Sequence, residues 1–227
     1  MQQQSTMNSR LVFLNAKQLL IKAGVSVANS KLTQSYLRLE NQMLVGKTQF
    51  QFFLLTTQVN NAGLIFNTEL CLNQQDSFVA SSWGFFLGKP ASNQDATFIL
   101  RSYATPADFS TAGTAAAAQT VYNSFWQLAV NNDIIVPAAD VYRHRSVPQT
   151  QFITFLPAAT GPQTANEDQI DGSSEGFHPV EPNIVFVGSK NNVLNLLMPA
   201  AFAAVESFGR MTCFFRGVLA QNSTIIT

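Results

Sequence analysis

Charged side chains are scarce in this chain of 227 residues. Lys, Arg, Asp and Glu make up 11% of it, against about 25% in an ordinary soluble domain. Thirteen basic residues balance thirteen acidic ones, so no overall field favours nucleic acid or a membrane surface. Amides replace the missing charge, with 18 Asn and 19 Gln, and Phe occurs 19 times. Because interface cores are poor in charge and rich in aromatic residues, this composition suits a protein that packs against copies of itself.

Long apolar runs and cysteine pairs are also missing. The longest apolar stretch, Leu196 to Val205, has 10 residues and contains Pro199, whereas a membrane-spanning helix needs about 20. The first residues lack the basic and apolar regions of a signal peptide, so we expect synthesis in the cytoplasm. Cys71 and Cys213 lie 142 positions apart in apolar surroundings, which favours two free thiols over a disulfide.

No pattern in the sequence predicts catalysis or a cofactor. Gly172 to Gly176 matches the Gly-x-Ser-x-Gly motif, but that nucleophile elbow requires a strand before the serine and a helix after it. Polar and acidic residues precede Ser174, and Phe-His-Pro follows. His144 has no zinc-type partner beside it, which indicates a structural histidine. We therefore predict a protein that is not an enzyme and needs no cofactor or metal.

Charge is balanced overall but separated along the chain. Residues 1–48 carry a net charge of +5, including Arg10, Lys17 and Lys22, and residues 157–182 carry −5. One interpretation is two solvated segments, with bound calcium as an alternative for the acidic one. The other is that the basic arm of one subunit contacts the acidic loop of a neighbour. The acids proposed for that inter-subunit contact are Glu167, Asp168 and Asp171.

The first 48 residues are expected to form a partly helical N-terminal arm. Leucines spaced along one face predict a helix from about Ser9 to Lys22, ended by Gly24. A second helix is predicted over Lys31 to Leu44, where apolar residues recur at intervals of three and four. Nucleic acid is a weak candidate partner for this arm, because its charges are spread out.

Residues 49–227 are expected to form a mainly β domain. The segment from Gln49 to Leu55 begins with alternating polar and apolar residues, as in a half-buried strand. Asn131, Asn132 and Asp133 between two apolar runs predict a tight hairpin, because Asn and Asp tolerate the left-handed backbone of such turns. Residues 114–122 predict a short helix. Many short strands with polar loops favour an antiparallel β-sandwich of the jelly-roll type, with residues 157–182 as a long acidic loop. Further strands are expected at 63–66, 77–87, 97–103, 125–130, 134–136, 151–156, 184–187, 193–197 and 210–219.

Adjacent aromatic residues predict contacts outside a simple two-sheet core. Successive strand residues face opposite sides, so each Phe-Phe pair sends one ring away from the core. The three rings expected to meet a helix, the arm or another subunit are Phe53, Phe86 and Phe215. Exposed apolar surface of this extent is typical of an interface.

The segment from Val141 to Gln151, together with Ser35 to Glu40, resembles virion structural proteins of bacteriophages, particularly those of Bacteroidetes hosts. The resemblance implies a capsid shell subunit or a capsid-associated protein, located in the virion, with copies of itself and other virion proteins as partners. The alternative is a β-sandwich binding module, such as a fibre or carbohydrate-binding head, in which Trp83 or Trp126 stacks on sugar.

Overall fold

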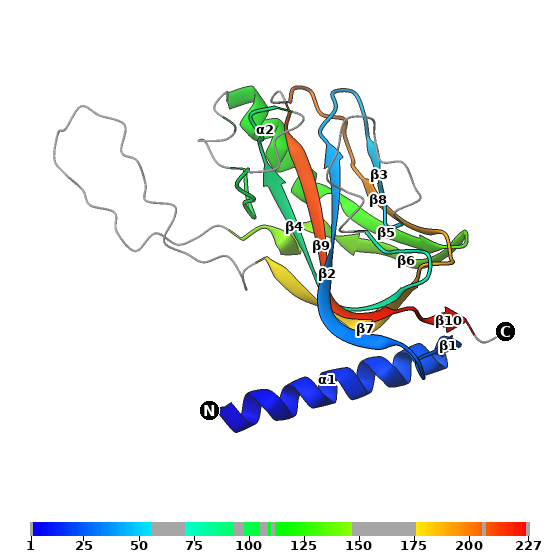
Figure 1. Ribbon diagram of the computed structural model, residues 1–227. Coiled ribbons are helices and arrows are strands. Elements are labelled where there is room, and N and C mark those ends of the chain that lie inside the picture. Colours follow the sequence, from blue (N-terminus) through cyan, green and yellow to red (C-terminus); the bar gives the residue numbers. More distant parts are fainter. Residues whose placement is uncertain are drawn as a thin grey trace.

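The computed structural model describes residues 2–55, 71–92, 98–104, 109, 112–146, 176–205 and 208–225. Strands dominate these segments, and two α-helices and two short 3-10 helices accompany them (Figure 1). The helices are α1 (Gln2–Lys22), α2 (Ala112–Thr120), η1 (Val121–Asn123) and η2 (Val141–His144). The strands are β1 (Val25–Ser26), β2 (Lys31–Gln42), β3 (Gln49–Phe53), β4 (Ser77–Gly88), β5 (Phe125–Val130), β6 (Asp133–Asp140), β7 (Phe177–Val187), β8 (Asn192–Leu197), β9 (Arg210–Gln221) and β10 (Thr224–Ile225).

Eight of the strands form two antiparallel four-stranded sheets. The first sheet has the order β2-β9-β4-β7 and the second has the order β3-β8-β5-β6. A small pair, β1 with β10, lies at one end. Every strand pairing is antiparallel, and the longest joins β2 to β9 from Lys31 and Gln221 to Gln42 and Arg210. The prediction of a mainly β protein is therefore confirmed.

The pairings are nested along the chain. The first of the eight strands, β2, pairs with the last, β9. Moving inward, β3 pairs with β8, β4 with β7 and β5 with β6. Two further pairings, β4 with β9 and β5 with β8, complete the sheets. The innermost turn is the predicted hairpin, in which Asn131 and Asn132 have φ of 51° and 72°, the left-handed conformation that asparagine tolerates.

The main core lies between the two sheets. Leu39, Phe85 and Phe215 of the first sheet are buried with Phe52 and Trp126 of the second. The short helix α2 and η1 add Ala117, Ala118, Val121 and Tyr122 to the same cluster. This arrangement leaves the opposite face of each sheet available for other contacts.

Helix α1 packs across the outer face of the first sheet, at the lower end in Figure 1. Its Ala16 and Leu20 are buried against Val79, Val218 and Ala220. The predicted helix from Ser9 to Lys22 lies within α1, which begins earlier, at Gln2. Within the part of the chain that the structure describes, no helix has the length and apolar character that crossing a membrane requires.

The helix predicted over Lys31 to Leu44 is wrong, because Lys31–Gln42 form strand β2 and the last two residues follow it without helical structure. The second half of the segment 1–48 thus belongs to the first sheet. The strand predicted at 97–103 is also wrong for residues 98–103, which make only an isolated bridge between Arg101 and Leu87. The strands predicted at 63–66 and 151–156 lie outside the described residues.

Candidate functional site

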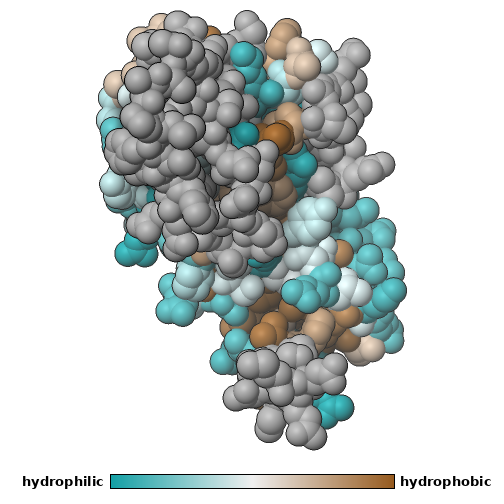
Figure 2. All heavy atoms as spheres, turned by 90° about the vertical axis from the view of Figure 1, so that its left-hand side faces the viewer, coloured by the Kyte–Doolittle hydropathy of each residue, from teal (hydrophilic) through white to brown (hydrophobic). Residues whose placement is uncertain are grey.

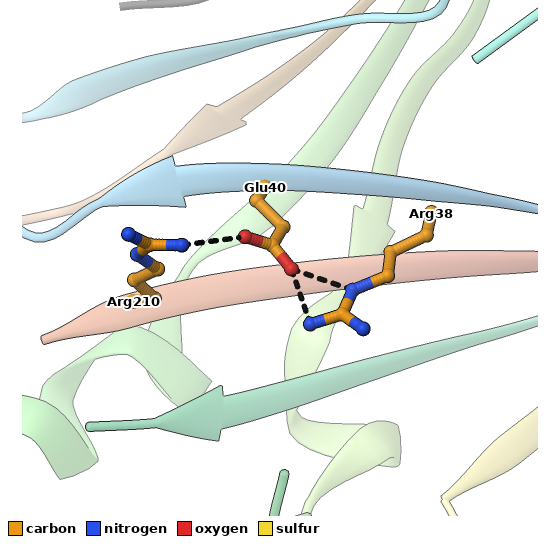
Figure 3. Close-up of polar contacts among 3 residues, drawn as sticks. All are labelled: Arg38, Glu40 and Arg210. Atoms are coloured by element: carbon orange, nitrogen blue, oxygen red, sulfur yellow. Dashed lines mark hydrogen bonds and ion pairs between the residues drawn. The ribbon is translucent and has the colours of Figure 1, made fainter. Parts of the chain in front are cut away.

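The most enclosed charged group lies on the outer face of the first sheet. Glu40 of β2 is held between Arg38, two residues earlier on the same strand, and Arg210 of the neighbouring strand β9 (Figure 3). Arg38 donates from Nε to Glu40 Oε1 over 2.5 Å, and Arg210 donates from Nη1 to Oε2 over 3.1 Å. Because side chains two apart on a strand share a face, and diagonal neighbours on adjacent strands are within reach, the register creates this ionic triad.

Phe98 covers the ionic triad. Its ring centre lies 5.5 Å from the guanidinium carbon of Arg38 and 5.4 Å from that of Arg210. Gly88 permits this approach, since a Cβ there would lie 2.5 Å from the Phe98 ring. Glu40 and Arg210 are consequently only 2% and 0% exposed, while Arg38 is 23% exposed. Such a closed arrangement links two strands and offers no access to a substrate.

An aromatic cluster continues along the same face. The Phe86 ring lies 5.3 Å from Phe177 and 5.7 Å from Phe214, and the Arg216 guanidinium lies 3.5 Å from the Phe177 ring centre. Tyr36 packs against Phe214 and remains exposed. Phe86 does face away from the core, as predicted, but rings of its own chain cover it and leave it 8% exposed.

Phe215 is not available to another subunit, contrary to the prediction. It is 0% exposed and lies between the sheets, with ring centres 6.0 Å from Trp83 and 5.2 Å from Phe186. The register of β9 turns Phe214 outward instead. Phe53 is half-buried on the outer face of the second sheet, so its contact with another subunit stays a prediction.

The basic residues predicted for subunit contact are exposed on α1. Arg10, Lys17 and Lys22 all lie at the surface. The same helix exposes large apolar side chains that its own sheet does not cover, namely Leu11, Val12, Leu14 and Ile21. Figure 2 shows apolar surface at the lower end of the molecule, where α1 meets the sheet. The helix thus offers a second, mixed basic and apolar face.

The acidic partners predicted for these basic residues, Glu167, Asp168 and Asp171, lie outside the described residues. The end of the predicted loop 157–182 is corrected by the structure, because β7 begins at Phe177. All thirteen Lys and Arg residues fall in the described segments, together with only five acids. The other eight acids are in the remaining segments, which contain no Lys or Arg.

The two histidines lie together beside the core. Their ring centres are 5.0 Å apart, and His144 also contacts Trp83 edge-on at 5.2 Å. His144 Nδ1 lies 3.3 Å from the Gly176 carbonyl oxygen, to which a ring protonated on Nδ1 donates. Burial lowers the pKa of His144 to about 4, although that hydrogen bond opposes the shift. A neutral, packed histidine results.

The remaining candidate groups are Cys213 and Trp126, which are buried, and Cys71 and Trp83, which are half-buried. Both cysteines are free thiols, as predicted, and burial raises the pKa of Cys71 to about 11 and that of Cys213 further. Trp126 is fully buried, and Trp83 packs against it at 6.3 Å. Among the described residues, no three His, Cys, Asp or Glu side chains gather closely enough to hold a metal ion.

The sequence did not indicate the ionic triad. Arg210 and Glu40 are 170 residues apart, and only the pairing of β2 with β9 brings them together. The alternation of Arg38 and Glu40 along one strand was the available signal, but a helical prediction for this segment hid it.

Comparison with known protein families, with curated proteins and with solved structures finds no match.

Proposed function

We propose that this chain is a non-enzymatic structural protein that assembles with copies of itself, as a subunit of a bacteriophage capsid shell. The nested strand order carries the proposal. Pairing of β2 with β9, β3 with β8, β4 with β7 and β5 with β6 is the order obtained when one long antiparallel hairpin is rolled into two sheets. A jelly roll of this kind recurs in viral capsid and lectin domains.

Exposed apolar surface supports assembly. Leu14 and Ile21 on α1 are 57% and 55% exposed, and Ile134 and Ile135 on the edge strand β6 are 56% and 49% exposed. Isolated exposed apolar residues are common, but clusters of them mark interaction sites. In this proposal α1 and the sheet surfaces contact neighbouring subunits, while the two-sheet core supplies rigidity.

The buried ionisable groups also fit a structural role. Glu40 is neutralised by two arginines, and His144 is packed against aromatic rings. Each is enclosed by side chains of its own chain, which suits a structural role better than contact with a substrate. The proposed mechanism is geometric, with synthesis in the host cytoplasm and a final location in the virion.

The alternative was a fibre or carbohydrate-binding head with Trp83 or Trp126 as the stacking platform. Trp126 has no exposed surface, and Trp83 packs against Trp126, His144 and Phe215. Trp126 therefore cannot reach a sugar, and the half-buried Trp83 has much of its indole occupied by these rings. We therefore favour the shell subunit.

The mass of the purified protein tests the proposal. We expect sedimentation and electron microscopy to show large closed particles or their curved fragments. A well-behaved monomer at tens of micromolar would contradict self-assembly. A small oligomer of fixed size would instead indicate a binding head.

A further inference from the structure

Among the described residues, the interior of the outer face of the second sheet carries no charged side chain. Strand pairing places the outward side chains of this face in three parallel rows, each of which runs across the strands from β3 through β8 to β5. The middle row is made of amides, with Asn195 of β8 between Gln51 of β3 and Gln127 of β5. We call the surface formed by the three rows the uncharged face.

The two flanking rows of the uncharged face are mainly apolar. One contains Phe53, Val193 and Ala129 and continues to Ile134 on β6, which is 56% exposed. The other contains Gln49, Leu197 and Phe125, which is 39% exposed. Charge enters this second row only at its end, where Asp140 of β6 pairs with Phe125. An apolar and amide interior with charge at the rim is the anatomy of a protein interface.

We propose that the uncharged face binds the same face of a second copy of this chain. The two copies are related by a two-fold axis that runs parallel to β8, midway between the two faces. The proposal rests on the proposed self-assembly and names one of its contacts. Two sheets packed face to face keep their strands within about 30° of each other. The axis therefore brings β3 of each copy over β5 of the other, and Asn195 over its own counterpart.

Hydrogen bonding favours a second copy as the partner. A primary amide both donates and accepts, so a row of three amides is complementary to itself after a two-fold rotation. Asn195 Oδ1 is buried without a hydrogen-bond partner among the described residues. Rotation of this amide toward the second copy would supply one.

Shape and charge point the same way. Around this axis the large Phe53 lies opposite the small Ala129, and Val193 and Leu197 each lie opposite themselves. No like charges meet in the interior, so self-contact incurs no repulsion there. The outward face of α1 differs, because it carries Arg10, Lys17 and Lys22 and no acid. Two copies of α1 would repel one another, which makes the uncharged face the better self-complementary surface.

A single charge at the centre of the uncharged face provides the first test. Asn195→Lys places two like charges across the axis, and we expect the assembled fraction at a fixed concentration to fall about tenfold or more. Gln34→Lys is the matched control, since Gln34 is an exposed amide on the outer face of the first sheet. Circular dichroism and melting of both variants show whether the fold is retained.

Cross-linking provides the second test, in the full chain with Cys71→Ser. Packed sheets are about 10 Å apart, which is too far for a disulfide, so the probe is a short bismaleimide. A mixture of Phe53→Cys and Ala129→Cys chains should give covalent dimers, and a mixture of Phe53→Cys and Gln34→Cys chains should not.

The outcomes separate the two proposals. If wild-type protein assembles and Asn195→Lys assembles equally well, the uncharged face is not the contact, although self-assembly stands. If the Phe53 and Gln34 mixture links as efficiently as the Phe53 and Ala129 mixture, the two-fold arrangement is wrong. If the wild type remains a monomer, self-assembly itself fails.

Discussion

Glu40 is enclosed with Arg210, and its charge cannot be removed without leaving a buried cation. We expect Glu40→Gln to lower the free energy of unfolding by about 3–5 kcal/mol, the usual effect of breaking one side of a buried ion pair. Chemical denaturation measures this. Arg38→Gln is the control, because the Arg38 side chain is 23% exposed and should lose only about 1 kcal/mol or less. Equal losses in the two variants would contradict the enclosed geometry.

His144 predicts a specific pH dependence. Its pKa falls from 6.5 to about 4 on folding, mainly through burial, so between these values the unfolded chain binds a proton that the folded chain does not. The stabilisation is therefore complete above pH 6.5 and is lost as the pH falls toward 4. The contribution of His144 to the free energy of unfolding is about 3 kcal/mol.

The measurement compares unfolding free energies of wild type and His144→Gln at about pH 7 and about pH 4. The wild type should lose more stability than the variant over this range. Parallel losses would show that His144 does not carry the effect.

The Phe-Phe pairs show what alternation can and cannot predict at single residues. Strand geometry requires one ring of each pair to leave the core, and Phe53 and Phe86 do so. The choice between Phe214 and Phe215 depends on the register of β9, which is set by pairing with β2 and β4. Because the two residues are identical neighbours, their sequence alone cannot show which of them faces the core.

Helix α1 both covers the first sheet and exposes apolar surface, so its removal should have two effects. Deleting residues 1–30 uncovers Val79, Val187 and Val218, which should lower the melting temperature. Among the residues whose burial the structure describes, the main core contains none before Leu37, so the β-type circular dichroism should remain. Assembly should be impaired, because the exposed side of α1 is lost.

Leu20→Ala is a milder variant for the same element. Leu20 is fully buried, and we expect a loss of about 2–5 kcal/mol with the outward face of α1 left intact. Assembly should then persist below the melting transition. If the truncated chain loses cooperative melting altogether, α1 is part of the essential core and the expectation is wrong.

Strand β2 shows why the sequence predicted most strands but not this one. Strands with one solvated side, such as β3 with its exposed glutamines, alternate clearly and were predicted. In β2, Leu37 and Leu39 face the main core while Leu32 on the other side packs under α1. Apolar residues on both faces break the alternation and imitate a helical spacing. The alternation is lost because α1, an element outside the strand, buries part of its outer face. The sequence of the strand alone does not indicate that contact.

At the scale of the whole molecule, the separation of charge predicts salt-dependent assembly. The described framework holds every basic residue, and eight of the thirteen acids lie elsewhere. Changing Glu167, Asp168 and Asp171 together to Gln or Asn should shift the sodium chloride dependence of assembly and leave the melting temperature unchanged. Each exposed pair contributes only about 0–1 kcal/mol, but the proposed shell would repeat it many times.

Light scattering over a salt series measures this shift, and Ser174→Ala serves as the neutral control from the same segment. Identical salt curves for the triple variant and wild type would mean that these acids are only solvated. A hydrolytic activity abolished by Ser174→Ala would overturn the structural interpretation of the protein.

The nested pairing also governs how the chain reaches its native state. The β5–β6 hairpin closes through the two residues Asn131 and Asn132, whereas Glu40 meets Arg210 only across 170 positions. Contacts between distant residues slow folding because the chain must close a long loop first. During translation, β2 and β4 stay without their shared neighbour until β9 has left the ribosome. For almost the whole of its synthesis the nascent chain therefore carries unpaired strand edges, which favour aggregation.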